Sequence, residues 1–290
     1  MQDRPIFECT EDRHWISSLP IAYYYLHKLS SSDMIITPNW HNEMEFLYTE
    51  APLTLYIDDK SCEMAPGDIA FINPRQIHRA VRNGPGEVYA FVFDLTLLKI
   101  SDDNDHSNQL IDEVIHQKKQ FIPKPKRDSE LYQKTKELFS VVKEYGSEPV
   151  GCGAERYELL SCLYAIMAVC LKSQCVEELS TNSREKLRYV KEMIDYINDH
   201  YQESLTAEYL SKQINLSPTY LYALFRDYIG ITPVNYINSI RLREAYRLLE
   251  QGMSVTQTAS AVGIPNVSYF IKLFKSATGQ TPLQWNGNKN

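Results

Sequence analysis

The stretch SPTYLYALFRDYIGITPVNY (217–236) has a second copy, NVSYFIKLFKSATGQTPLQW (266–285), at a constant offset of 49 residues and without a gap. Six positions are identical in the two copies: Tyr220/Tyr269, Leu224/Leu273, Phe225/Phe274, Gly230/Gly279, Thr232/Thr281 and Pro233/Pro282. Self-similarity of this kind indicates that one structural unit is built twice. The repeat therefore predicts the architecture of the last hundred residues.

Each copy begins and ends with residues that define a helix. Ser217 and Asn266 are suited to cap a helix N-terminus, and Gly230 and Gly279 can adopt the left-handed conformation that ends one. A Thr-Pro pair then starts the next helix in each copy. Short helices are predicted just before the copies, over Thr206–Ile214 and Ser254–Val262. A short helix, a tight turn and a second helix form a helix-turn-helix unit, whose second helix enters the DNA major groove.

The repeat, from about 184 to 285, closely resembles the DNA-binding domain of the AraC/XylS family of transcription regulators. In that family two helix-turn-helix units are joined by a long helix, here Val234–Glu250. The chain departs from the family pattern at Pro265, in the second turn, and at Gln284 and Trp285, where an aromatic residue followed by Arg is frequent.

The resemblance implies which residues contact DNA. The first recognition helix would present Thr219, Tyr222 and Ala223 to bases and Arg226 to a phosphate. The second would present Val267, Ser268 and Lys272 to bases and Lys275 to a phosphate. Arg241 and Arg247 either reach phosphate or pair with Glu244 or Glu250, and we include Arg241 among the expected DNA contacts. Paired apolar and aromatic residues are expected in the core instead: Leu224, Leu273, Phe225, Phe274, Tyr220 and Tyr269.

Charge is distributed in agreement with a DNA-binding C-terminus. The chain of 290 residues has a net charge of −7, but residues 184–290 contain 12 Lys+Arg and 9 Asp+Glu. That region is therefore net +3, and residues 1–183 are net −10. Positive charge favours contact with phosphates, although +3 is only mildly basic.

Composition favours a soluble globular protein, with 43% hydrophobic and 23% charged residues. We find no apolar run of the ~18 residues that crossing a bilayer requires. No secretory signal pattern is present, so we expect a cytoplasmic protein without membrane contact. The six cysteines form no CxxC pair and are expected to be reduced: Cys9, Cys62, Cys152, Cys162, Cys170 and Cys175.

The N-terminal part has the pattern of a β-barrel or sandwich. Short strands are predicted at Ala22–Leu26, Glu45–Thr49, Leu53–Ile57, Asp68–Ile72 and Val88–Phe93, followed by a loop at Ser101–His106 and helices over Ser129–Tyr145 and Ala154–Ser173. The second helix is rich in apolar residues, which would pack either in an intramolecular core or partly against a second copy in a homodimer. A polar break at Glu177–Ser183 is the predicted domain boundary.

The fold class predicted is thus α+β, in three regions. Residues 1–110 form a ligand-binding barrel, residues 111–180 a helical dimerisation region with a linker, and residues 184–290 the DNA-binding domain with two helix-turn-helix units. The segments NWHNEMEFLYTE (39–50) and APGDIAFINPRQIHR (65–79) resemble the cupin-like barrels found ahead of such domains.

In metal-binding cupins, three His and one Glu are ligands. The matching positions here are Asn39, His41, Glu45 and His78, so one His is replaced. Two imidazoles and a carboxylate can still hold a divalent metal. Because regulators of this family usually do not use the barrel for catalysis, we expect no catalytic residue, resident cofactor or metal, and expect both histidines to hydrogen-bond to a ligand or to neighbours.

Aromatic and polar residues around the predicted barrel mouth suit a sugar, whose C–H faces stack on rings while its hydroxyls need hydrogen-bond partners. The expected ligand-binding residues are Tyr23, Tyr25, Trp40, His41, Glu43, Glu45, Arg75, His78 and Tyr89, with Tyr48, Phe91 and Arg79 nearby. Half of these aromatic residues are equally well explained as barrel core, because strand alternation buries every second residue.

The function predicted is a homodimeric transcription activator that binds promoter DNA, responds to a sugar or oligosaccharide, controls a carbohydrate-use operon and contacts RNA polymerase. Two alternatives remain open. A metal-dependent cupin enzyme with an appended helical domain would not explain the repeat. A DNA-bending or adaptor protein would bind no small ligand.

Overall fold

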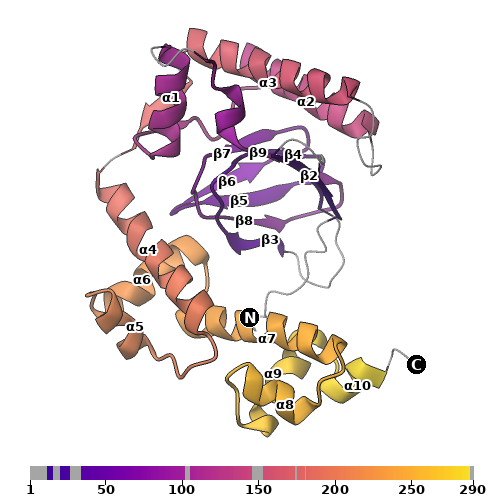
Figure 1. Ribbon diagram of the computed structural model, residues 1–290, viewed down its shortest axis with the longest axis vertical. Helices are drawn as coiled ribbons and strands as arrows, with labels where there is room; N and C mark the ends of the chain where they lie inside the picture. The colour runs from indigo at the N-terminus through magenta and orange to yellow at the C-terminus, as the bar shows by residue number, and fades with distance from the viewer. Residues whose placement is uncertain are drawn as a thin grey trace. The chain divides into compact units, whose positions relative to one another are not determined.

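The computed structural model describes residues 12–15, 20–26, 34–101, 105–145, 153–173, 175–179 and 181–287. The chain divides into two compact units, with the boundary between Arg184 and Glu185. We call the described residues up to Arg184 the sheet unit and those from Glu185 the helical unit (Figure 1). Antiparallel sheets with helices precede an all-helical region, which confirms the α+β fold class. Cys9 and Cys152 lie outside the described residues.

Two antiparallel sheets form the centre of the sheet unit. The larger has the order β1-β2-β9-β4-β7, and the smaller has the order β3-β8-β5-β6. Their bounds are β1 Asp12–Trp15, β2 Ile21–Tyr25, β3 Met34–Asn39, β4 Met44–Thr49, β5 Leu53–Ile57, β6 Lys60–Met64, β7 Ile69–Ile72, β8 His78–Arg82 and β9 Val88–Phe93. A further short pair consists of β10 Lys119–Phe121 and β11 Val176–Glu178.

The two faces of the larger sheet are buried differently. Along β4, Met44 and Phe46 belong to a core shared with helices, whereas Leu47 belongs to a second core that also contains Leu55 and Ala80 of the smaller sheet. The covering elements are the 3-10 helix η1 Leu95–Leu98 and the helices α1 His106–Ile115, α2 Glu130–Tyr145 and α3 Ala154–Lys172, which lie over one face in Figure 1. The strand period of two thus separates a helix-facing side from an interior side.

Several predicted elements have different bounds in the structure. Residues 106–115 form α1, where only a loop ending at His106 was predicted. The predicted polar break is also wrong in part, because Val176–Glu178 pairs with β10 and α4 already begins at Thr181. Polar or proline-containing strands were missed altogether: β3 includes Pro38, β6 is an exposed edge strand and β8 begins with His78 and Arg79. Among the described residues, no helix is long and apolar enough to cross a membrane.

The helical unit consists of seven helices among the described residues. They are α4 Thr181–His200, α5 Ala207–Gln213, α6 Pro218–Ile229, α7 Pro233–Glu250, α8 Val255–Ala261, α9 Val267–Thr278 and α10 Pro282–Gly287. The α5–α6 and α8–α9 pairs are the two predicted helix-turn-helix units, and α7 joins them (Figure 1).

Both units are built with the predicted caps. The Ser217 hydroxyl accepts from the Tyr220 N–H at 3.3 Å, and the Asn266 side chain accepts from the Tyr269 N–H at 3.0 Å. Gly230 and Gly279 end the recognition helices with φ values of 83° and 79°. The short helices that precede them start at matching N-caps, Thr206 and Ser254. These two caps are 48 residues apart rather than 49, so Pro265 is the one extra residue of the second turn.

The turn that follows α4 contacts the joining helix α7 and the second helix-turn-helix turn. Arg241 of α7 donates to the carbonyl oxygens of Tyr201 and Glu203, at 2.7 and 2.6 Å. Gly263, in the second helix-turn-helix turn, approaches the backbone of Gln202 so closely that a Cβ would lie 2.3 Å from its carbonyl oxygen. Residues 201–203 therefore fix α7 and the second turn to each other.

Candidate nucleic-acid interface and effector site

Each recognition helix has one buried and one exposed face. In α6, Leu221, Leu224 and Phe225 are buried, whereas Thr219, Ala223 and Arg226 are exposed and Tyr222 is half-buried. In α9, Phe270 and Phe274 are buried, whereas Ser268, Lys272 and Lys275 are exposed and Val267 is half-buried. The expected contact residues thus share the accessible sides of the two helices, which satisfies the first geometric requirement for reading DNA.

Tyr220 and Tyr269 are not core residues, contrary to our expectation. Their side chains are 41% and 48% exposed, and the Tyr269 hydroxyl lies 3.4 Å from the Asn238 amide nitrogen on α7. Both occupy the same position in the first turn of a recognition helix. Helical spacing accounts for the exposure of Tyr220, because it lies three residues before exposed Ala223 and seven before exposed Asp227, on the same face of the helix.

Two arginines of the joining helix have intramolecular partners. Arg241 is half-buried and holds the carbonyl oxygens of the turn after α4, rather than Glu244 or Glu250. The Arg247 guanidinium makes a 3.0 Å contact to Glu244, which lowers the pKa of that carboxyl. Both side chains have a structural role in the chain as described.

A carboxylate and two imidazoles meet in the interior of the sheet unit. Glu45 points to the interior side of β4 and is 4% exposed, and His78, at the start of β8, is 2% exposed. The Glu45 Oε2 atom lies 3.0 Å from His41 Nε2 and 3.3 Å from His78 Nε2. The structure therefore brings together three of the residues expected at the effector site.

The other nitrogen of each imidazole faces a main-chain carbonyl. His41 Nδ1 is 3.1 Å from the Glu43 oxygen, and His78 Nδ1 is 3.1 Å from the Gln76 oxygen. Burial alone would raise the pKa of Glu45, but the charge of His78 and hydrogen bonds from both imidazoles lower it to about 2. Burial lowers the pKa of His41, and its contacts with Glu45 outweigh that effect and raise it. The cluster thus favours an ionised Glu45 carboxylate in contact with two imidazoles.

The expected aromatic lining is divided between the two sides of the larger sheet. Tyr23 pairs with Phe91 and belongs, with Tyr89, to the core beneath the helices rather than to the interior around Glu45. Tyr89 also lies beneath Lys143 of α2, whose ammonium is 4.3 Å from the ring centroid. Tyr25 pairs with Tyr89 in the strand register, and its side chain lies outside the described residues. We therefore remove Tyr23 and Tyr89 from the candidate site.

The remaining expected residues are close to His41 in the chain. Trp40 directly follows β3 and is half-buried, Glu43 is partly exposed, and the Glu43 carboxylate is 3.7 Å from His41 Nδ1. The Arg75 N–H donates to the His41 oxygen at 2.7 Å, while its side chain is exposed. Arg79 stacks on Tyr56 at 3.4 Å, on the outer side of the smaller sheet. Asn39, at the replaced His position, donates to the Thr37 oxygen.

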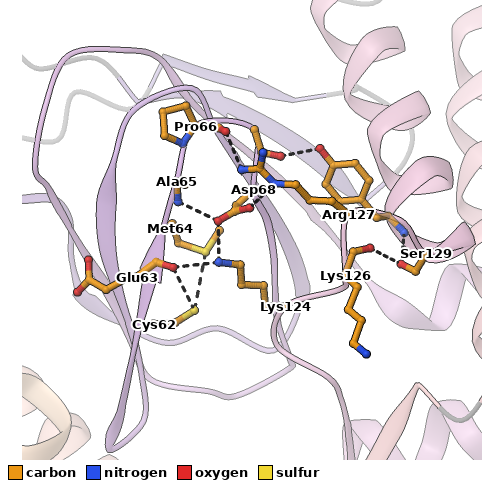
Figure 2. A network of polar contacts seen from close by, with 12 residues as sticks. Cys62, Glu63, Met64, Ala65, Pro66, Asp68, Lys124, Lys126, Arg127 and Ser129 are labelled. Carbon is orange, nitrogen blue, oxygen red and sulfur yellow. Dashed lines mark hydrogen bonds and ion pairs between the residues drawn. The ribbon is translucent and has the colours of Figure 1, made fainter.

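A polar network joins the turn between β6 and β7 to the segment before α2 (Figure 2). The Asp68 carboxylate pairs with Lys124 at 2.6 Å and Arg127 at 2.8 Å, and accepts the Ala65 N–H at 2.8 Å. Arg127 also donates to the Pro66 oxygen. The sequence around Asp68 has no signal for partners almost 60 residues away.

A second network leads from His78 to the β10–β11 pair. The Gln76 side chain accepts from the Asn73 amide at 3.1 Å, and Asn73 in turn bonds both the N–H and the oxygen of Phe121 in β10. Gln120, beside Phe121, donates to Glu177 of β11. The interior site is thus connected, through main-chain and side-chain hydrogen bonds, to the strand that ends three residues before α4 begins.

Comparison with known proteins identifies a family model for a C-terminal segment and relatives that match part or nearly all of the chain. A family model described as a helix-turn-helix domain matches residues 210–288. The HTH-type transcriptional regulator YdeC of Bacillus subtilis is 22% identical over 98% of this chain and 96% of its own length. The transcriptional activator and DNA repair enzyme AdaA of the same organism is 36% identical over 35% of this chain, which spans about half (53%) of AdaA.

Another relative is the Msm operon regulatory protein of Streptococcus mutans, which is 27% identical over 42% of this chain and 45% of its own. Among solved structures, the C-terminal domain of AraT, a response regulator from Geobacillus stearothermophilus, is 29% identical and covers 34% of this chain and 84% of that one, with a TM-score of 0.34.

Proposed function

We propose that this chain, a DNA-binding transcription regulator of the AraC/XylS family, reads its promoter through both recognition helices and responds to a small effector bound in the sheet unit. The observation that carries the proposal is the repeat itself: two helix-turn-helix units whose recognition helices are capped at equivalent positions and expose the same face. Because the units are joined by one helix, we expect both to bind the same face of the duplex, in major grooves about one helical turn, or 34–36 Å, apart.

The two recognition helices are expected to contribute differently. The exposed residues of α6 are Thr219 and Ala223, which suit contacts with a thymine methyl group, together with half-buried Tyr222. In α9, Lys272 has the reach and charge for guanine acceptors. Arg226 and Lys275, one turn further along, are assigned to phosphate. Arg241 is no longer proposed as a contact, because its guanidinium holds the turn after α4.

The experiment that tests this compares Lys272→Ala and Arg226→Ala in gel shifts on a cognate and a random duplex. Lys272→Ala should weaken cognate binding by about 1–3 kcal/mol and random binding much less. Arg226→Ala should weaken both and reduce the salt slope by about one. Lys136→Ala, an exposed charge change in α2 of the sheet unit, is the control. Unchanged binding in both test variants would refute the assignment.

For the sheet unit we propose a cupin-like domain that binds a sugar or oligosaccharide at the interior site. Half-buried Trp40 offers a ring, and His41, Glu43 and Glu45 offer hydrogen-bonding groups. The small apolar cavity between the larger sheet and α3, of about 10 Å³, does not suit a sugar, because it is far too small and its lining is entirely apolar. The chain would activate a carbohydrate-use operon and contact RNA polymerase. It would act in the cytoplasm and have no catalytic role.

We further propose that α3 pairs two copies of the chain. Its buried face includes Leu159, Leu163 and Ile166, yet the opposite face also presents large side chains at intervals of seven residues: Tyr157, Tyr164 and Leu171. A stripe with this spacing on one helix can face its counterpart on a second copy around a two-fold axis.

A further inference from the structure

Arg241 lies at the middle of α7, between the two places where that helix packs against the recognition helices. On one side of it, Tyr236 contacts Phe225 of α6, with ring centroids 5.3 Å apart. On the other side, Tyr246 contacts Phe274 of α9, with ring centroids 4.8 Å apart. Phe225 and Phe274 are equivalent positions of the repeat. Because one helix carries both recognition helices, a bend or twist at its middle would change their separation.

The turn after α4 holds α7 at this middle position. Arg241 donates from Nε to the Tyr201 oxygen at 2.7 Å and from Nη2 to the Glu203 oxygen at 2.6 Å. Both donors belong to one planar guanidinium, so the two bonds form together in a single orientation. The turn is held in shape by its own contacts, since the Glu203 N–H donates to the His200 oxygen and the Glu203 carboxylate lies 2.7 Å from His200 Nδ1.

The second helix-turn-helix unit meets α7 and the turn on the same side. Gly263 approaches the Gln202 backbone so closely that no side chain fits between them. Asn238, three residues before Arg241 and therefore on the same face of α7, donates to the Tyr269 hydroxyl of α9 at 3.4 Å. The turn and the second unit are thus attached to α7 side by side.

Helix α4 also contacts the first helix-turn-helix unit. The Tyr196 hydroxyl on α4 lies 2.9 Å from the Tyr209 hydroxyl on α5. Residues 201–203 follow α4 directly, so α4 and its turn connect the first unit to the second, in addition to the connection through α7. Long helices bend gently, and a second connection restricts such bending.

We propose that Arg241 is a positioning residue that sets the spacing between the two stretches of DNA that the recognition helices read. The inference rests on the proposed function. One extra base pair moves the second stretch by about 3.4 Å along the duplex and rotates it by about 35°. Recognition helices held in one arrangement cannot follow that shift, unless the duplex itself is deformed at a cost in free energy. Release of the turn would let the second unit follow it.

The test uses the full chain and three duplexes, in which the two stretches that it selects from a random library have the preferred spacing, one base pair more or one fewer. The wild-type chain should bind the two altered duplexes about tenfold or more weakly. With Arg241→Gln or Gly263→Ala, binding to the preferred duplex should weaken and the spacing penalty should fall to about threefold or less. Arg243→Gln, which removes an exposed charge from the same helix, should keep the wild-type penalty.

Arg241→Lys keeps the charge but loses the planar pair of donors, so it should also reduce the penalty. Circular dichroism identifies any variant that does not fold, and the remaining variants then decide. A full wild-type penalty in the folded variants, or equal weakening on all three duplexes as loss of a phosphate contact would give, would overturn the proposal. Equal binding of the three duplexes by the wild-type chain would overturn it too. A wild-type chain that selects no sequence at all would instead refute the proposed function.

Discussion

Asp68 illustrates how one buried carboxylate stabilises a turn through partners far along the chain. Burial would raise the pKa of Asp68, but hydrogen bonds from Lys124, the Ala65 N–H and Arg127 lower it below its usual value (Figure 2). A carboxyl with a lowered pKa in the folded state adds stability above its unfolded pKa, and this stability is lost as the pH falls through the folded value.

We therefore predict that Asp68→Asn lowers the free energy of unfolding by about 1–3 kcal/mol at neutral pH, because three donors lose a charged acceptor. The difference from wild type should begin to shrink as the pH falls below about 3.9, where the carboxyl of the unfolded chain takes up a proton, and should continue to shrink down to the lower pKa of the folded carboxyl. Chemical denaturation across pH measures this. Asp59→Asn, at an exposed position, is the control, and a deficit that does not change with pH would contradict the ionic origin.

Individual residues also show where sequence reasoning reached its limit. Glu45, His41 and His78 were placed in one site because two sequence segments resembled a known ligand set, and the structure brings them together. Tyr23 and Tyr89 were misplaced, since a strand pattern that is apolar on both faces does not reveal which face meets helices. Tyr220 and Tyr269 were misassigned because identity between repeats was interpreted as core packing.

At the scale of elements, two independent constraints require glycine at position 263, in the turn between α8 and α9. Its φ of 75° disfavours any side chain, and the Gln202 backbone occupies the space of a Cβ. Gly252, at the end of α7, has a similar φ of 86° but nothing within 4 Å of the Cβ position. The two glycines thus separate the conformational cost from the packing cost.

Gly252→Ala is expected to destabilise the helical unit by about 1 kcal/mol, the cost of the left-handed conformation. Gly263→Ala should cost clearly more, about 2 kcal/mol or above, because the turn after α4 must also move. Hydrogen exchange of peptides from α8 and α9 reports the loss locally. Equal effects of the two substitutions would show that the contact with Gln202 is unimportant.

Elements were predictable where the chain is regular. The capping residues and glycines of the repeat predicted the first and last residues of α5 to α9 almost correctly, because a residue type suited to a helix end lies at each boundary. Strands β6 and β8 carry no such marker: one is a polar edge, and the other begins with His78 and Arg79. The pairing of β10 with β11 joins segments more than 50 residues apart, which single-sequence periodicity cannot detect.

For the whole molecule, the proposed pairing through α3 predicts a homodimer that a charge in the exposed stripe would weaken. Leu171→Glu should raise the dimer dissociation constant about tenfold or more, since a buried leucine contributes about 1.5–3 kcal/mol. Sedimentation velocity measures it. Lys136→Glu, at an exposed position of α2, is the control. A wild-type chain that stays monomeric at micromolar concentration would refute the pairing.

The central claim is that one chain reads DNA with two helix-turn-helix units, and selection of binding sites from a random duplex library tests it most directly. We predict enriched sites with two conserved stretches whose centres lie about 10–10.5 base pairs apart, one helical turn. With Lys272→Ala, the preference should relax in one stretch only. Enrichment of a single short stretch, or no enrichment of any sequence by the folded wild-type chain, would contradict the account.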